Sequence, residues 1–160
     1  MNERRLNQLE EERSVLHRLL IRNHNQHGNT PLFKQLKGLS KNLLTISPGV
    51  IRDVSTRSEK SIRASTLNKY SISEIRSFFS CLDALSTVVD VGIEALERCY
   101  SVSTLLCPML AKMVFVPLYS LLLALNARLF SALATVVLHF HTCFQALVSQ
   151  VKVRTSSFEC

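Results

Sequence analysis

Residues that interrupt helices are scarce in this sequence, and their scarcity restricts the folds open to the chain. Only 4 Gly and 4 Pro occur among 160 residues. An all-β protein needs a turn every several residues, and turns are built largely from these residue types. Hydrophobic residues make up 47% of the chain and charged residues 19%, a balance that allows a buried core. The sequence therefore predicts an all-α protein.

Apolar residues recur every three or four positions near the amino terminus, which is the spacing of one helix face. We expect a first helix from about Glu3 to His27, which ends at Gly28. A second helix should follow at once, with Thr30 as its N-cap and Pro31 as its first residue. Because the connection is short, the two helices are predicted to form a basic antiparallel helical hairpin.

The remaining chain divides into a polar stretch and a long apolar region. The polar stretch is rich in Ser, Thr, Lys and Arg, which predicts a basic linker with at most one helical turn. The apolar region is expected to form two long antiparallel helices. The predicted division is a hairpin over residues 1–46, a linker over 47–70 and the helical pair over 71–160.

Capping and proline signals set the expected ends of the two long helices. Ser71 and Glu74 have the spacing of a capping box that opens the third helix. We expect that helix to break around Ser101 to Cys107 and Pro108 to open the fourth, with a kink at Pro117. The predicted buried face of the third helix comprises Ile75, Phe78, Phe79, Leu82, Leu85, Val89, Ile93 and Leu96. Its outer face carries an acidic row, interpreted as solvated, of Asp83, Asp90, Glu94 and Glu97.

The net charge of +7 is concentrated in the amino-terminal half. Residues 1–76 contain 14 Lys or Arg and 7 Asp or Glu, whereas residues 77–160 contain 5 of each class. A local basic excess suits a polyanion, which is either a nucleic acid or an acidic membrane surface. Solvated surface charge is the alternative interpretation.

The fourth helix is apolar enough to raise the question of a membrane. Residues 113–127 lack formal charge, but this run is shorter than the ~20 residues that cross a bilayer. Beyond it a polar stripe recurs at helical spacing, formed by Arg128, Ser131, Thr135, His139, Thr142, Gln145, Ser149 and Lys152. We therefore expect a helix that docks on protein, with no membrane partner.

The five cysteines are odd in number and contain no CxxC pair. They are interpreted as buried free thiols, and neither a disulfide framework nor a metal site is expected. No cofactor is predicted. A zinc site at His24 and His27 would need two further ligands, and none follows at a suitable spacing.

The most unusual segment runs from Arg22 to Gly28 and contains Asn23, His24, Asn25, Gln26 and His27. The Asn, Gln and His side chains donate and accept hydrogen bonds, and the Arg guanidinium can donate two parallel hydrogen bonds to one phosphate. At a helix end they can read exposed bases or 2′-hydroxyls of folded RNA. The alternative is a polar helix terminus that fixes the turn. We expect Asn23 to point inward and bond the hairpin turn, and His24, Gln26 and His27 to face outward beside Arg22.

Residues 12–44, ERSVLHRLLIRNHNQHGNTPLFKQLKGLSKNLL, resemble the RNase MRP-specific protein subunit family. The family hallmark is an Asn-basic-Asn-Gln-His run that closes a first helix, and Asn23 to His27 match it, with His24 in the basic position. Relatives often carry Trp just after the run, where this chain has Phe33, and a basic residue after the His, where it has Gly28. The later half is similar in outline, with Arg128 near the middle of a long apolar helix.

The resemblance implies a non-catalytic subunit of a ribonucleoprotein endonuclease whose active site is RNA. Such proteins act in the nucleolus, within the nucleus, in precursor ribosomal RNA processing. The partners implied are RNase MRP RNA and other protein subunits, the latter held through the fourth helix. The expected RNA-binding residues are Arg18, Arg22, His24, Asn25, Gln26, His27, Lys34, Lys37 and Lys41, with Asn23 as a structural residue and no catalytic residue. A membrane-associated or adaptor protein is the alternative, and an independent ribonuclease ranks last.

Overall fold

The computed structural model describes residues 3–64, 72–113 and 115–156, and over these ranges the protein is all-α. Five helices follow one another, and the described residues contain no strand. The helices are α1 (Glu3–His27), α2 (Pro31–Thr45), α3 (Pro48–Ala64), α4 (Ile72–Ala111) and α5 (Val116–Ser156).

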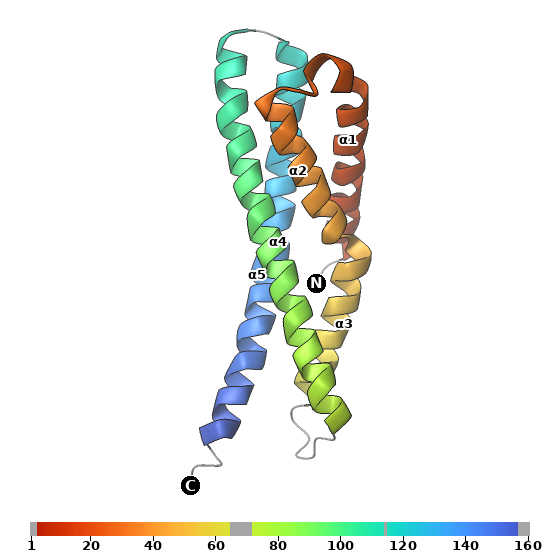
Figure 1. The fold of residues 1–160 in the computed structure, drawn as a ribbon, viewed down its shortest axis with the longest axis vertical. Coiled ribbons are helices and arrows are strands. Elements are labelled where there is room, and N and C mark those ends of the chain that lie inside the picture. Colours follow the sequence, from red (N-terminus) through yellow and green to blue (C-terminus); the bar gives the residue numbers. More distant parts are fainter. Residues whose placement is uncertain (1–2, 65–71, 114, 157–160) are drawn as a thin grey trace.

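The two long helices α4 and α5 run antiparallel and pack against each other along most of their length (Figure 1). The shorter helices lie against this pair: α2 contacts α4, α1 contacts α5, and α3 contacts both. In Figure 1 α1 and α2 lie beside the half of the pair that contains the α4–α5 turn, and α3 lies beside the other half. The predicted pair of long helices is confirmed, and the amino-terminal hairpin packs on it.

The first two helices end where the sequence predicts. Thr30 has extended φ and ψ of −70° and 149°, and its hydroxyl accepts a hydrogen bond from the Phe33 amide at 3.3 Å. Pro31 opens α2, where its missing N–H has no helical partner to lose. Leu16, Leu36 and Leu39 are among the most buried side chains of the protein.

Residues 48–64 form α3, so the prediction of a linker with at most one helical turn is wrong over this segment. Ile51 and Val54 are buried, and Ser58 is only 1% exposed. These three residues have helical spacing, but the polar residues between them conceal the stripe in the sequence. The structure does not describe residues 65–71, so the expected capping box at Ser71 and Glu74 lies outside the described residues.

The third helix also continues further than expected. No break occurs around Ser101 to Cys107, because α4 runs to Ala111 and contains Pro108 in its last turn. The proline removes one helical hydrogen bond close to the end, where the loss matters least. Pro117 lies in the first turn of α5, so the expected kink there is replaced by an ordinary helix start.

The buried face of α4 differs in part from the predicted one: Leu85 and Val89 are buried as predicted, but three other members are exposed. Ile75, Phe79 and Ile93 are exposed by 44%, 62% and 44%. Smaller residues form most of the inner face instead, namely Cys81, Val88, Gly92, Ala95, Cys99 and Val102. A Cβ at Gly92 would stand 2.5 Å from Cγ2 of Val137, so α4 and α5 approach closely there. Close packing selects small side chains, whereas the prediction had selected large ones.

The cysteines agree in part with their interpretation as buried thiols. Cys81 and Cys99 are free and buried, Cys143 is half-buried and Cys107 is exposed. Burial raises the pKa of the Cys99 thiol to about 12, which keeps it protonated and unreactive. Cys160 lies outside the described residues.

Candidate RNA-binding surface

The α1–α2 turn is held by a compact set of hydrogen bonds. The Gly28 amide donates to the His24 carbonyl at 2.8 Å, and the Thr30 amide donates to the His27 carbonyl at 2.9 Å. Lys37 reaches back from α2 and donates from Nζ to the Gly28 carbonyl at 3.3 Å. The turn therefore fixes where the end of α1 lies relative to the lysines of α2.

Eight of the predicted RNA-binding residues are exposed on these two helices. Along α1 they are Arg18, Arg22, His24, Asn25 and Gln26, and along α2 they are Lys34, Lys37 and Lys41. Within the described part of the chain, no carboxylate lies at ion-pair distance from any of their basic groups. We call these eight residues the basic hairpin surface. Their charges are available to a ligand, although Lys37 also caps the end of α1.

Asn23 is half-buried, as its structural assignment anticipated, but its partner differs. Its Nδ2 donates to the Leu19 carbonyl at 2.9 Å, one turn earlier in α1. The side chain thus strengthens the last turns of its own helix and does not bond the hairpin turn. The signal for its inward position was its phase with Leu16 and Leu20.

His27 does not face outward, and this part of the prediction is wrong. The residue is only 9% exposed. Its ring stacks on Phe33 with centroids 5.4 Å apart and meets the edge of Phe115 at 5.2 Å and Tyr119 at 6.4 Å. His27 is therefore the contact between the α1–α2 turn and the start of α5. Its buried Nε2 has no hydrogen-bond partner among the described residues.

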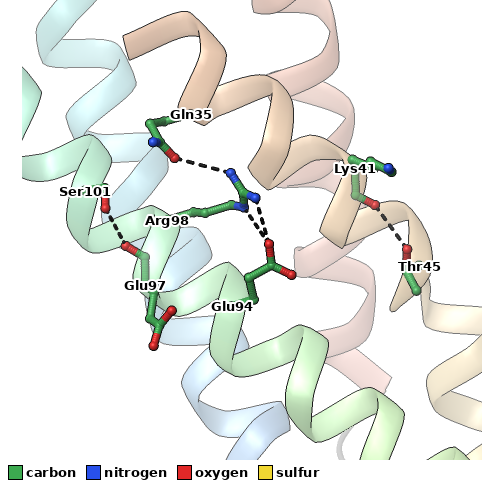
Figure 2. A network of polar contacts seen from close by, with 7 residues as sticks. All are labelled: Gln35, Lys41, Thr45, Glu94, Glu97, Arg98 and Ser101. Atoms are coloured by element: carbon green, nitrogen blue, oxygen red, sulfur yellow. Dashed lines mark hydrogen bonds and ion pairs between the residues drawn. The ribbon is translucent and has the colours of Figure 1, made fainter. Parts of the chain in front are cut away.

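A polar network joins α2 to α4 (Figure 2). The Arg98 guanidinium donates to Glu94 at 2.7 Å and to Oε1 of Gln35 at 3.3 Å. Gly38 makes room for it, because a Cβ there would collide with the Arg98 guanidinium. The hydrogen bond from Arg98 lowers the pKa of the Glu94 carboxyl. Glu94 is thus paired, and Figure 2 shows the Lys41 ammonium pointing away from it.

A second polar contact joins α1 to α5 and was not foreseen in the sequence. Arg128, which interrupts the apolar run of α5, lies 3.1 Å from Glu12, whose side chain is only 9% exposed. Arg5 donates to Thr135 at 2.7 Å, a residue of the same polar stripe. The stripe is therefore partly covered by α1. A signal was present, because Glu12 falls between Leu9 and Leu16 at helical spacing and so lies on the leucine face.

Among the described residues no cluster of three or more His, Cys, Asp or Glu side chains is placed to hold a metal ion. His139 and Cys143 lie close together on α5, with Nε2 and Sγ 4.0 Å apart. Partial burial lowers the pKa of His139 and raises that of Cys143, so both are held in their neutral forms.

One helix has the length and composition of a membrane span. Residues Val116–Ser149 of α5 contain a window of mean hydropathy 2.0, of which 44% is buried within the protein. A core helix of a soluble bundle has the same properties, so length and composition alone do not choose between the two.

No protein-family model, curated protein or solved structure matches this chain. What the chain does is therefore inferred from its own residues and from the resemblance of its amino-terminal segment.

Proposed function

We propose that this protein is a non-catalytic, RNA- and protein-binding scaffold subunit of the RNase MRP ribonucleoprotein, with a role in precursor ribosomal RNA processing in the nucleolus. Its RNA-binding part is the hairpin of α1 and α2. Its protein-binding part is the pair of long helices α4 and α5. Helix α5 is the one that the sequence predicts to bind other protein subunits.

The observation that carries the proposal is the basic hairpin surface. It contains Arg18, Arg22, Lys34, Lys37 and Lys41, all exposed, on two packed helices whose geometry is fixed by the turn. Arg22, His24, Asn25 and Gln26 follow one another at the end of α1, so charge and hydrogen-bonding groups lie together. Such a combination suits folded RNA, in which phosphates and unpaired bases are presented side by side.

The salt dependence of RNA binding tests this proposal. Lys34→Gln/Lys41→Gln removes two exposed charges and spares Lys37, whose cap on Gly28 supports the turn. With RNase MRP RNA as the probe, each lost phosphate contact should reduce the slope of log K against log salt by about 0.7–0.9. Lys60→Gln/Lys112→Gln removes the same charge from exposed positions on α3 and beyond α4 and serves as the control. Equal slopes for both variants and the unchanged protein would refute the proposal.

The absence of catalysis is a separate part of the proposal. The purified protein should not cleave single-stranded RNA, because cleavage would need an acid and a base placed around one phosphate. Cleavage that disappears in His24→Ala would show that the protein is itself a nuclease.

The second candidate is a membrane-associated or adaptor protein, and the apolar length of α5 is the observation in its favour. Extraction of cell membranes with alkaline carbonate separates the two candidates. The scaffold subunit should be released into the soluble fraction, whereas a protein spanning the bilayer through Val116–Ser149 should remain in the membrane pellet.

A further inference from the structure

One side of α4 carries a regular, mainly apolar pattern that the bundle covers only in part. Starting at Ile75, successive members follow at alternating steps of four and three, which is the heptad spacing of a coiled coil. The series is Ile75, Phe79, Leu82, Ser86, Val89, Ile93, Leu96 and Tyr100, and we call it the α4 seam. A sustained heptad seam is the pattern with which one helix packs along another.

The seam lies beside the α4–α5 contact and is open to solvent at four of its eight positions, whereas Val89 is buried and Leu82, Ser86 and Leu96 are half-buried. Phe79 is 62% exposed, Tyr100 71%, and Ile75 and Ile93 each 44%. From Leu82 onward, the position just before each seam residue is buried, and two of these positions, Gly92 and Cys99, contact α5. Their contacts there are Val137 and Asn126.

Helix α5 also carries a large exposed apolar side chain near its contact with α4. Asn126 donates to the Cys99 carbonyl at 2.8 Å and so marks where α5 meets α4. Phe130 follows one turn later and is 46% exposed. Large exposed apolar side chains thus occur on both helices of the pair.

The other flank of the seam begins with Arg76 and is acidic beyond it. Asp83, Asp90 and Glu97 follow at intervals of seven residues, each directly after a seam residue. All three are exposed, and within the described ranges no basic group forms an ion pair with any of them. In a coiled coil these flanking positions select the partner by charge. These three residues belong to the acidic row that was expected only to face solvent. Their spacing also places them at one flanking position of the heptad repeat.

We propose that the α4 seam binds an amphipathic helix of another protein that has an apolar heptad face and a flanking row of Lys or Arg. The inference rests on the protein-docking part of the proposed function and names the chemistry of that partner. A second copy of this chain is disfavoured, because antiparallel pairing of two seams would place acidic row against acidic row. An anionic membrane is disfavoured for the same reason, since the row would face its phosphates.

The test uses the full chain and no RNA, so its failure is distinguishable from failure of RNA binding. The probe is a synthetic helical peptide of about four heptads with Leu at the a and d positions and Lys at the e and g positions. The comparison peptide carries Glu at e and g. The Lys peptide should bind in a titration followed by fluorescence anisotropy, and the Glu peptide should bind about tenfold more weakly or worse.

Charge reversal on the protein makes the test specific. Asp83→Lys/Glu97→Lys should reverse the preference between the two peptides, while Glu11→Lys/Glu59→Lys, with the same change in net charge at exposed positions of α1 and α3, should leave it unchanged. Phe79→Ser should abolish binding without unfolding, because the ring is exposed, and circular dichroism checks the fold.

Four results would each overturn the inference. They are no binding of the Lys peptide, equal binding of both peptides, a dimer in sedimentation that Phe79→Ser dissolves, and binding to phosphatidylcholine vesicles, with or without phosphatidylserine, that Phe79→Ser removes.

Discussion

The α1–α2 hairpin and the α4–α5 pair use their apolar residues differently. In the hairpin nearly all large apolar side chains pack into the core, and the exposed exceptions are Ile21 and Leu44. In the pair, exposed apolar side chains remain after packing is complete, including Phe79, Tyr100 and Phe130. The hairpin surface is thus suited to water and charged ligands, whereas the pair keeps apolar side chains exposed.

The contacts between these two regions are also of two kinds. Leucines of α1 and α2 pack against the pair, and polar contacts, among them one hydrogen bond and one ion pair, cross between the layers. Arg98 of α4 bonds Gln35 of α2, and Arg128 of α5 bonds Glu12 of α1. If the hairpin folded independently of the pair, these contacts would contribute little to its stability. Substitutions at each contact therefore test whether the two regions fold as one unit.

The largest effect is expected from Leu39→Ala. Leu39 is fully buried in α2, which packs on α4, so the truncation should lower the free energy of unfolding by about 2–5 kcal/mol. Leu44→Ala is the control, because this neighbour on α2 is 58% exposed and should change stability little. Chemical denaturation followed by helical signal should show one transition for both variants. Two separate transitions would mean that hairpin and pair fold independently.

The next effect concerns the ion pair between α1 and α5. Arg128→Met should cost about 1–3 kcal/mol, because Glu12 would be left buried without its partner. The double variant Glu12→Met/Arg128→Met should recover most of the loss, since it leaves no uncompensated charge.

Denaturation of the three proteins gives the coupling free energy between the two residues directly. A double variant as unstable as the sum of its single changes would show that the two side chains do not interact.

How much of this molecule could be predicted depends on how strongly each segment is patterned. The start and end of α1 and the cap at Thr30 were predictable, because leucine spacing, Gly28 and the Thr-Pro pair are local signals. Helix α3 was missed because Ile51, Val54 and Ser58 are too few to mark a face among polar residues, and its burial is supplied by α4 and α5.

The orientation of individual side chains was harder to predict than the helices. The buried face of α4 was predicted only in part, correctly at Leu85 and Val89 and wrongly at Phe79. Hydrophobicity shows which residues are able to be buried, while the packing partners decide which ones are. Gly92 and Ala95 carry little hydrophobic signal, yet they allow close approach of neighbouring helices. At the candidate site, the exposure of Lys34 and Lys41 followed from helical phase, but the burial of His27 depended on Phe115 and Tyr119, which are distant in the sequence.

A comparison between neighbouring residues of α1 should separate stability from RNA binding. Asn23→Ala removes the bond to the Leu19 carbonyl and should lower stability by about 0.5–1.5 kcal/mol. Arg22→Ala removes an exposed charge and should leave the melting temperature unchanged while weakening RNA affinity by ~1–3 kcal/mol.

Gln26→Ala, also exposed, should behave as Arg22→Ala does, with a smaller loss because its amide is uncharged. Melting temperature and RNA affinity are measured on the same preparations. Parallel loss of both quantities in all three variants would mean that this segment is structural only.

The smallest effect is expected at His27, where the two regions meet. Its ring lies among Phe33, Phe115 and Tyr119, and its Nε2 is buried without a hydrogen-bond partner in the described ranges. His27→Phe keeps a ring of similar shape and removes the unsatisfied nitrogen, so stability should stay within about 1 kcal/mol or rise. RNA affinity should not change, because the side chain is not accessible.

His24→Phe is the matched control on the exposed side of the same helix end and should weaken RNA binding without affecting the melting temperature. Reduced RNA affinity in a stably folded His27→Phe protein would instead show that this histidine leaves the aromatic cluster to reach the RNA.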